Sequence, residues 1–189
     1  MSILLAVTDL VDSRISLSLE TPLTFDVFKE DILYVCGRNG SGKTTLLRMV
    51  ADLETPIKGN LSKSSGLFFC GHQTGMKASL SVWDNLRFRT SVYGNGSESH
   101  IDAVLGIFEL GKKKHYPLET LSLGQQHLVS LASAVLSPHL LWVFDEPFAH
   151  LDAQSEELLM TVMKNHTKSG GAVLLSTHVA INGEKTLSL

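Results

Sequence analysis

Residues 37–44 read Gly37-Arg38-Asn39-Gly40-Ser41-Gly42-Lys43-Thr44, which matches the pattern G-x-x-x-x-G-K-[ST]. They follow an apolar run over residues 32–36 and precede a helix-like segment over residues 45–51. Between a strand and a helix, such glycines let backbone N–H groups converge on phosphate oxygens, and the helix N-terminus adds partial positive charge. The pattern therefore predicts a phosphate-binding loop, although taken alone it also fits a glycine-rich turn with a chance lysine.

Four side chains have predicted roles toward a bound nucleotide. Lys43 is expected to reach the β- and γ-phosphates, and Thr44 is expected to ligate Mg²⁺. A second apolar run, residues 140–144, ends in the carboxylates Asp145 and Glu146. Asp145 can hold the Mg²⁺ shell, and Glu146 can polarise a water for attack on the γ-phosphate.

Two further segments carry weaker signals. Residues 121–126 place Ser122 and Gly124 just ahead of a helix, which predicts a second anion-binding helix start; an ordinary serine-capped helix is the alternative. His178 closes the apolar run over residues 172–175 at a strand end. A lone histidine in that position is usually a surface or capping residue.

In their order along the chain, the four segments resemble the Walker A, signature, Walker B and switch-histidine motifs of ABC ATPase nucleotide-binding domains. The resemblance covers nearly the whole chain. Gln73, after the strand-like residues 67–70, matches the Q-loop glutamine, and residues 149–152 match the D-loop. The signature departs from the family pattern, because Leu123 replaces the usual glycine and His127 stands where an arginine is common.

The resemblance implies ATP and Mg²⁺ as ligands. It implies ATP contacts from the loop and from the signature, namely Gly37, Arg38, Asn39, Gly40, Ser41, Gly42, Lys43, Thr44, Thr45, Ser122, Gly124 and Gln125. It implies Mg²⁺ ligation by Thr44, Gln73 and Asp145, and catalysis by Glu146, His178 and Gln73. In that family two domains pair head to tail, so Ser122 and Gly124 would act on the nucleotide of the partner in a homodimer.

The implied fold is α/β, a P-loop NTPase of the ABC type. Alternating strands and helices predict a mostly parallel core sheet, and the early segments predict an N-terminal antiparallel β region over residues 3–27. A small helical insert is expected within one domain spanning residues 1–189, as a helical subdomain over roughly residues 75–137. Inside it, Ile101, Val104, Leu105 and Phe108 are spaced to share one helix face.

Composition narrows the function classes. With 189 residues, 43% of them hydrophobic and 19% charged, the chain is expected to form one domain with a substantial core. A net charge of −3 argues against a nucleic-acid partner, which needs a basic surface. The dense basic run Lys112-Lys113-Lys114 is expected to be a solvated loop. Cys36 and Cys70 are expected to be free buried thiols.

A closer resemblance concerns the haem-exporter ATP-binding subunits of cytochrome c maturation. It rests on residues 71–77 and 84–88, the doubled glutamine Gln125-Gln126, residues 141–148 and Gly170-Gly171. It implies a polytopic, CcmB-like membrane subunit as partner and a peripheral location on the cytoplasmic face of the inner membrane. Other functions stay open, namely an ATPase subunit for lipoprotein release or metal import, or a soluble nucleotide-switched interaction module.

Two expectations concern surfaces of the domain. The segment 75–88 is expected to dock the membrane subunit through an apolar patch of Met76, Leu80, Val82 and Trp83. No aromatic side chain ahead of the phosphate-binding loop is placed convincingly to stack on adenine, since Phe25 and Phe28 fit core positions better.

Overall fold

The structure is a computed structural model, and it describes residues 2–15, 22–71, 75–93, 97–178 and 184–189. The chain forms two compact units. The first unit comprises Met1–Gly71, His139–Pro147 and Val162–Leu189. The second comprises His72–Pro138 and Phe148–Thr161, so the chain enters and leaves it twice.

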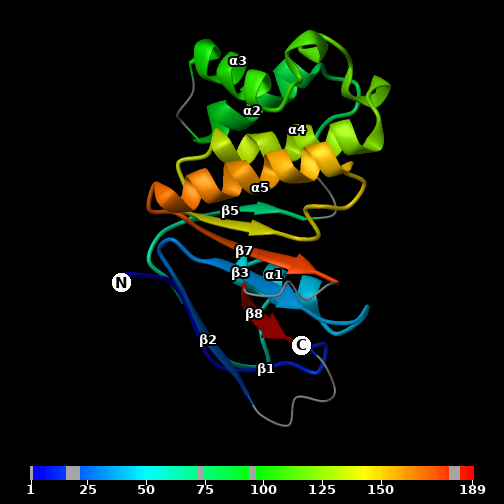
Figure 1. The fold of residues 1–189 in the computed structure, drawn as a ribbon. Coiled ribbons are helices and arrows are strands. Elements are labelled where there is room, and N and C mark those ends of the chain that lie inside the picture. Colours follow the sequence, from blue (N-terminus) through cyan, green and yellow to red (C-terminus); the bar gives the residue numbers. More distant parts are fainter. Residues whose placement is uncertain (1, 16–21, 72–74, 94–96, 179–183) are drawn as a thin grey trace. The chain divides into compact units, whose positions relative to one another are not determined.

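The first unit is built on a five-stranded parallel sheet (Figure 1). Its strands lie in the order β5 (Leu67–Cys70), β6 (Leu141–Phe144), β7 (Ala172–Thr177), β3 (Ile32–Cys36) and β8 (Lys185–Ser188). The predicted strands over residues 32–36 and 67–70 are found with the same bounds. Strand β8 was not predicted, because only one of its four side chains is even half-buried and its sequence therefore has no apolar run.

A three-stranded antiparallel sheet completes the first unit, in the order β2 (Leu23–Phe28), β1 (Ile3–Val11) and β4 (Lys58–Lys63). This confirms the predicted N-terminal antiparallel region. Helix α1 (Lys43–Val50) buries Leu46, Leu47, Met49 and Val50 in one apolar core together with residues of both sheets. Removing apolar surface from water stabilises a fold by about 25 cal/mol per Å². The burial of these side chains therefore anchors the helix that carries the phosphate-binding loop.

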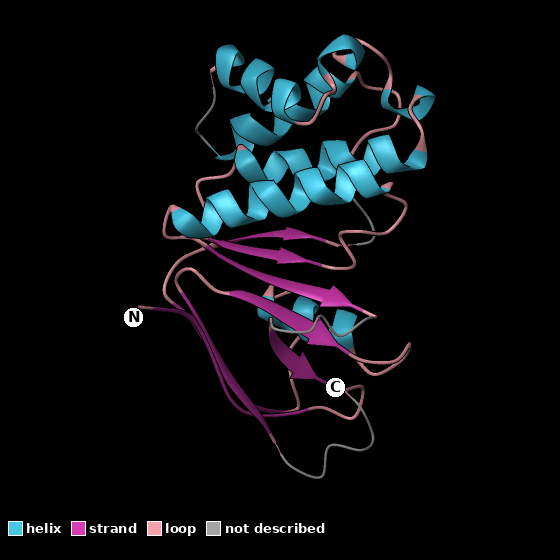
Figure 2. Cartoon of the chain, viewed as in Figure 1, coloured by secondary structure: helices cyan, strands magenta, loops and turns pink. Residues whose placement is uncertain are grey.

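The second unit is built from helices and turns (Figure 2). Its helices are α2 (Val82–Tyr93), α3 (Glu98–Ile107), α4 (Leu123–Val135) and the first part of α5 (Ala153–Lys168), with short 3₁₀ turns at Gly111–Lys113 and Leu118–Thr120. The four apolar side chains predicted to share a face of α3 are all buried, at 1–2% exposure. Ser81 caps α2, because its hydroxyl accepts a hydrogen bond from Asp84 N at 3.0 Å.

The parallel sheet determines where the chemistry of the first unit can lie. Strands β3, β6 and β7 run in the same direction, so their carboxyl ends meet at one edge. The phosphate-binding loop follows β3, the two carboxylates follow β6, and His178 follows β7. Ligands of open α/β sheets bind outside such carboxyl ends.

Candidate active site

The phosphate-binding loop wraps around the ammonium group of Lys43. Its Nζ donates to the carbonyl oxygens of Gly37 at 2.8 Å and Arg38 at 3.1 Å, and the residue is only 5% exposed. Lys43 is also the first residue of α1, and the N–H groups of a first helical turn have no partner within the helix. A buried cation beside these N–H groups makes a site for an anion.

Glycine is required at two positions of this loop. Gly42 has φ 98°, and a Cβ there would lie 2.5 Å from the carbonyl oxygen of Arg14. A Cβ on Gly37 would lie 2.5 Å from Ser41 Oγ and 2.8 Å from the carbonyl oxygen of Leu189. Side chains at either position would displace the backbone around the loop, so the sequence pattern reflects close packing as well as a turn.

An unpaired polar atom indicates that the loop is built for a ligand. Ser41 Oγ is buried and has no hydrogen-bond partner among the described atoms. Buried polar groups are normally paired. A phosphate oxygen held by the loop would supply the missing partner, so the residues present fit a phosphorylated ligand.

Asp145 is held at the end of β6 by two hydroxyl groups. Thr44 Oγ1 donates to its Oδ2 at 2.9 Å, and Ser176 Oγ donates to its Oδ1 at 2.7 Å. The residue is 6% exposed, and its own N–H donates to the carbonyl oxygen of Cys70 on the neighbouring strand. The predicted pair Thr44 and Asp145, 101 residues apart in sequence, thus lies in direct contact.

Glu146 and His178 form the second predicted pair, with Glu146 Oε1 and His178 Nε2 separated by 2.7 Å. The other ring nitrogen, Nδ1, lies 3.4 Å from Lys43 Nζ. An ammonium group can only donate, so Nδ1 must accept and Nε2 must carry the proton that is donated to Glu146. Lys43, His178 and Glu146 therefore form one directional chain of hydrogen bonds.

These side chains open onto one hollow of about 380 Å³ in the first unit. Its size is within the range of small-molecule pockets. The described residues that line it are Arg14, Asn39, Gly40, Gly42, Lys43, Thr44, Thr45, Glu146 and His178. Eight of these nine were predicted as ATP contacts or catalytic residues, and the ninth is Arg14.

The signature residues form a helix start in the second unit. Ser122 caps α4, accepting from Gln125 N at 3.2 Å, while Gln125 Oε1 accepts from Ser122 N at 3.3 Å. This capping box shows that the serine-capped helix, left open as the alternative, is present. A Cβ on Gly124 would lie 2.5 Å from the carbonyl oxygen of His150, so the D-loop packs directly on this glycine.

A hollow of about 300 Å³ lies beside the signature helix. Ser122, Gly124 and Gln125 line it together with His150 and Asp152. Asp152 caps α5, and the hydrogen bond that its carboxylate accepts from Ser155 N, at 2.8 Å, lowers its pKa. The Asp152 carboxylate is thus held in place by the start of α5 where it lines this second hollow.

One predicted site residue falls outside the described part of the chain, and two expectations need correction. Gln73 lies outside the described residues. Val82 and Trp83 are buried, at 0% and 9% exposure, so they are core residues and not part of an exposed docking patch. The expected apolar patch of Met76, Leu80, Val82 and Trp83 is therefore wrong for this pair, because α2 turns both side chains into the core. The basic run is not simply solvated either, because Lys114 Nζ pairs with Asp102 at 2.6 Å and lies over the ring of Trp83.

Two residues of the site were missed from the sequence. Ser176 bonds the Asp145 carboxylate and also accepts from Glu146 N at 2.8 Å, so it connects β7 to both acids. Arg14 lines the phosphate-loop hollow. Ser176 stands next to the residues that were singled out at the end of β7, but only the register of β7 against β6 reveals its partners.

Comparison with known proteins places the chain among transport ATPases. Residues 21–149 match the family model described as ABC transporter. The cytochrome c biogenesis ATP-binding export protein CcmA of Vibrio vulnificus (strain YJ016) is 37% identical over 188 residues, which covers 93% of this chain and 92% of that relative. CcmA of Xanthomonas axonopodis pv. citri (strain 306) is 37% identical over 187 residues, covering 94% and 87%.

Solved structures agree with this placement. One described as the ATP binding subunit of an ABC transporter superposes with a TM-score of 0.82 at 25% identity, covering 93% of this chain and 80% of that chain. Among the described residues, every helix is too short or too polar to traverse a lipid bilayer.

Proposed function

The chain belongs to the ABC transporter family as an ATP-hydrolysing subunit, and we propose that Glu146 is its general base and His178 the group that orients it. The observation that carries this proposal is the hydrogen-bond chain from Lys43 through His178 to Glu146, which ends at a carboxylate on the rim of the phosphate-loop hollow. A carboxylate that accepts the Nε2 proton of a fixed tautomer is held in one orientation. It can then take a proton from an attacking water.

Thr44 and Asp145 are the residues that would hold Mg²⁺, because they bring a hydroxyl and a carboxylate oxygen together beside the loop. These are the hard oxygen ligands that the ion prefers. When bound, Mg²⁺ supplies neutralisation of phosphate charge. Ser176 keeps Asp145 in place by bonding the carboxylate oxygen that Thr44 does not use.

The signature side supports a head-to-tail homodimer. Ser122, Gly124 and Gln125 form an α4 N-terminus that lines its own hollow, and a helix start of this kind favours negative charge. The signature of one copy would contact the nucleotide held by the loop of the other. Leu123, which is 67% exposed, lies at the position where the signature departs from the family pattern and would face the partner.

An exposed apolar face on α2 is the best candidate for docking a CcmB-like membrane subunit. Phe88 and Val92 lie one helical turn apart and are 59% and 67% exposed. Residues four apart on a helix share a face, so the two side chains make one patch in the segment that follows the Q-loop. Docking there would hold the chain peripherally at the cytoplasmic face of the inner membrane.

The transport assignment follows the relatives. Since the similar proteins named CcmA span almost the full length of this chain, we assign it to haem export during cytochrome c maturation. A strain that lacks the gene should make haem but no c-type cytochromes, as seen by peroxidase staining. Normal cytochromes in that strain would end the haem assignment, and a different co-purifying membrane subunit would point to lipoprotein release or metal import.

A single substitution tests the hydrolytic role. Glu146→Gln should leave ATP affinity intact and lower the hydrolysis rate by about 10²- to 10⁴-fold, the usual scale for a general base. Because ATP then persists, the dimer should be retained on size exclusion in Mg-ATP. An unchanged rate would remove Glu146 from the chemistry, and a monomer under saturating nucleotide would contradict the dimer.

A further inference from the structure

Asn85 is a polar side chain in the interior of the second unit. It lies on α2 and is only 4% exposed. Its Oδ1 accepts a hydrogen bond from the N–H of Lys77 at 2.8 Å, and its Nδ2 donates to the carbonyl oxygen of the same residue at 2.9 Å. The side-chain amide thus pairs with the backbone of Lys77 as a residue on a neighbouring antiparallel strand would.

The same amide also holds the end of the segment that leads into α2. Its Nδ2 lies 3.3 Å from the carbonyl oxygen of Leu80 and 3.0 Å from that of Ser81. Residues 77–80 form neither helix nor strand, so their backbone polar groups need partners from elsewhere. Asn85 therefore holds both ends of the segment 77–81 against the first turn of α2.

The segment 77–81 is also bonded to the turn that precedes the signature. The N–H groups of Leu118 and Glu119 donate to the carbonyl oxygens of Leu80 and Ala78, at 2.9 and 3.0 Å. The 3₁₀ turn that contains these two donors ends just before the N-cap of α4. A continuous set of hydrogen bonds therefore runs from α2, through the Asn85 amide and the segment 77–81, to the start of α4.

The position requires an amide, because the backbone around it presents one donor and three acceptors. Aspartate has nearly the same shape, but a carboxylate can only accept. It would keep the hydrogen bond from the N–H of Lys77 and would turn a negative charge toward three carbonyl oxygens. Because the site is buried, the lost hydrogen bonds are not replaced by bonds to bulk water, and the loss is costly.

We propose that Asn85 is a positioning residue for ATP hydrolysis, which sets the place of the signature helix start relative to α2. The proposal rests on the head-to-tail homodimer, in which Ser122 and Gly124 of one copy contact the nucleotide of the other. Since α2 also carries Phe88 and Val92, the same amide ties the proposed docking face for the membrane subunit to the residues that complete the ATP site of the second copy.

Asn85→Asp in a Glu146→Gln background tests the effect on the dimer. The ATP affinity of the dilute, monomeric protein, measured by calorimetry, should equal that of Glu146→Gln alone, because the phosphate-binding loop is untouched. The dissociation constant of the dimer in saturating Mg-ATP, measured by analytical ultracentrifugation, should rise by about 10- to 100-fold, the change that loss of one hydrogen bond to a charged group produces. A dimer as stable as that of Glu146→Gln would overturn the proposal.

Amide hydrogen exchange of the full chain without nucleotide tests the positioning independently of the dimer. Asn85→Asp should speed exchange at the N–H groups of Leu118 and Glu119, and in the first turn of α4, by about 10-fold or more. Unchanged exchange at these groups would overturn the proposal. If Glu146→Gln alone stays monomeric in Mg-ATP, the head-to-tail dimer is refuted, even where exchange shows that Asn85 holds the start of the signature helix.

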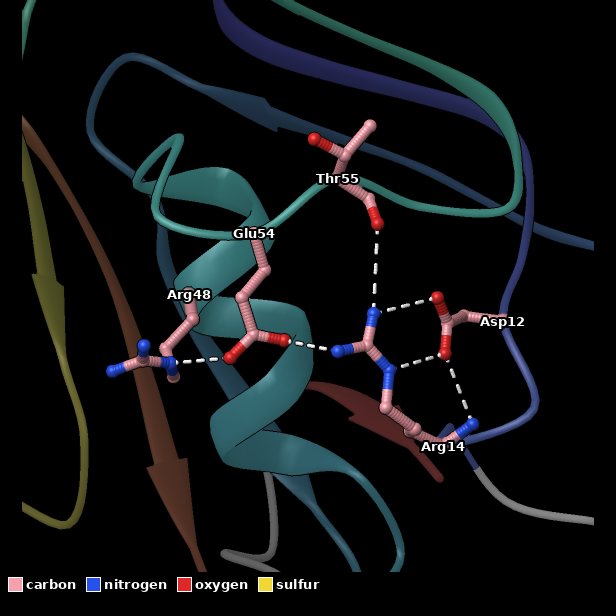
Figure 3. A network of polar contacts seen from close by, with 5 residues as sticks. All are labelled: Asp12, Arg14, Arg48, Glu54 and Thr55. Carbon is pink, nitrogen blue, oxygen red and sulfur yellow. Dashed lines mark hydrogen bonds and ion pairs between the residues drawn. The ribbon is translucent and has the colours of Figure 1, made fainter.

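Thr90→Val is the matched control on the same helix. Thr90 is 3% exposed, and its hydroxyl donates to the carbonyl oxygen of Arg87 within α2. Arg48→Ala controls for lost stability in the first unit, where Arg48 pairs with Glu54 at 2.5 Å in the network of Figure 3. Both controls should leave the dimer and the exchange before α4 unchanged. If either control weakens the dimer as much as Asn85→Asp does, the effect is one of general stability and the proposal fails.

Discussion

Ser176→Ala tests whether β7 holds the two acids of the site in place. The hydroxyl is fully buried, donates to Asp145 Oδ1 at 2.7 Å and accepts from Glu146 N at 2.8 Å. Alanine removes both hydrogen bonds and leaves a carboxylate oxygen and a backbone N–H without this partner. The first bond involves a charged group and contributes about 1.5–3 kcal/mol, and the second about 1 kcal/mol.

The free energy of unfolding in Ser176→Ala should therefore fall by about 2–4 kcal/mol, as measured by chemical denaturation. The turnover number for ATP should fall by about 10- to 100-fold at a temperature where the variant stays folded, since displacement of a catalytic group by about 1 Å has effects of this size. ATP affinity should change little, because the loop and Lys43 are untouched.

Ser133→Ala provides the matched control for this substitution. Ser133 is equally buried, but its hydroxyl donates only to the carbonyl oxygen of Ser130 within α4. Its loss should cost about 1 kcal/mol of stability and leave turnover unchanged. If both serine variants lose the same stability and Ser176→Ala hydrolyses ATP at the wild-type rate, Ser176 does not position the acids.

Three further substitutions separate binding, packing and docking. Lys43→Ala removes the buried cation of the loop, and calorimetry should find nucleotide affinity lost with the fold intact; retained affinity would mean that the loop is only a turn. Gly124→Ala places a Cβ 2.5 Å from the carbonyl oxygen of His150 and should lower stability by about 1–3 kcal/mol in denaturant titrations. Phe88→Asp should abolish co-purification of the membrane subunit while ATP affinity stays unchanged. Leu53→Asp is the control, at a residue similarly exposed in the other unit, and should leave co-purification intact. Loss of co-purification in both variants would show that α2 has no specific docking face.

The fold was largely predictable because its core elements have strong local signals. Apolar runs of four or five residues predicted β3, β5, β6 and β7, and the first three of these runs are followed directly by glycine or an acid. The spacing of Ile101, Val104, Leu105 and Phe108 predicted the buried face of α3. Strand β8 escaped prediction because a strand with exposed side chains is stabilised by its ladder with β3, which leaves no apolar pattern in the sequence.

Residues of the site were predictable only where the spacing of a sequence motif identifies them. Lys43 and Thr44 stand in a dense pattern, whereas Arg14 precedes that pattern by more than twenty positions and carries no motif of its own. Its place in the hollow depends on the packing of its backbone against Gly42. The wrong expectation for Val82 and Trp83 has a related origin. Apolar residues next to a helix start can face either solvent or the core, and the packing of the neighbouring elements determines which.

Adjacent acids at the end of β6 occupy different environments, and the backbone explains how. Asp145 is buried and accepts from two hydroxyls, whereas the side chain of Glu146 is 36% exposed and contacts an imidazole. Glu146 has φ 52°, a left-handed conformation that costs a non-glycine residue about 1 kcal/mol or more. The hydrogen bond that its N–H donates to Ser176 Oγ offsets part of that cost. One hydroxyl on β7 therefore both fixes the acid that would hold the metal ion and stabilises the backbone turn that directs its neighbour toward His178.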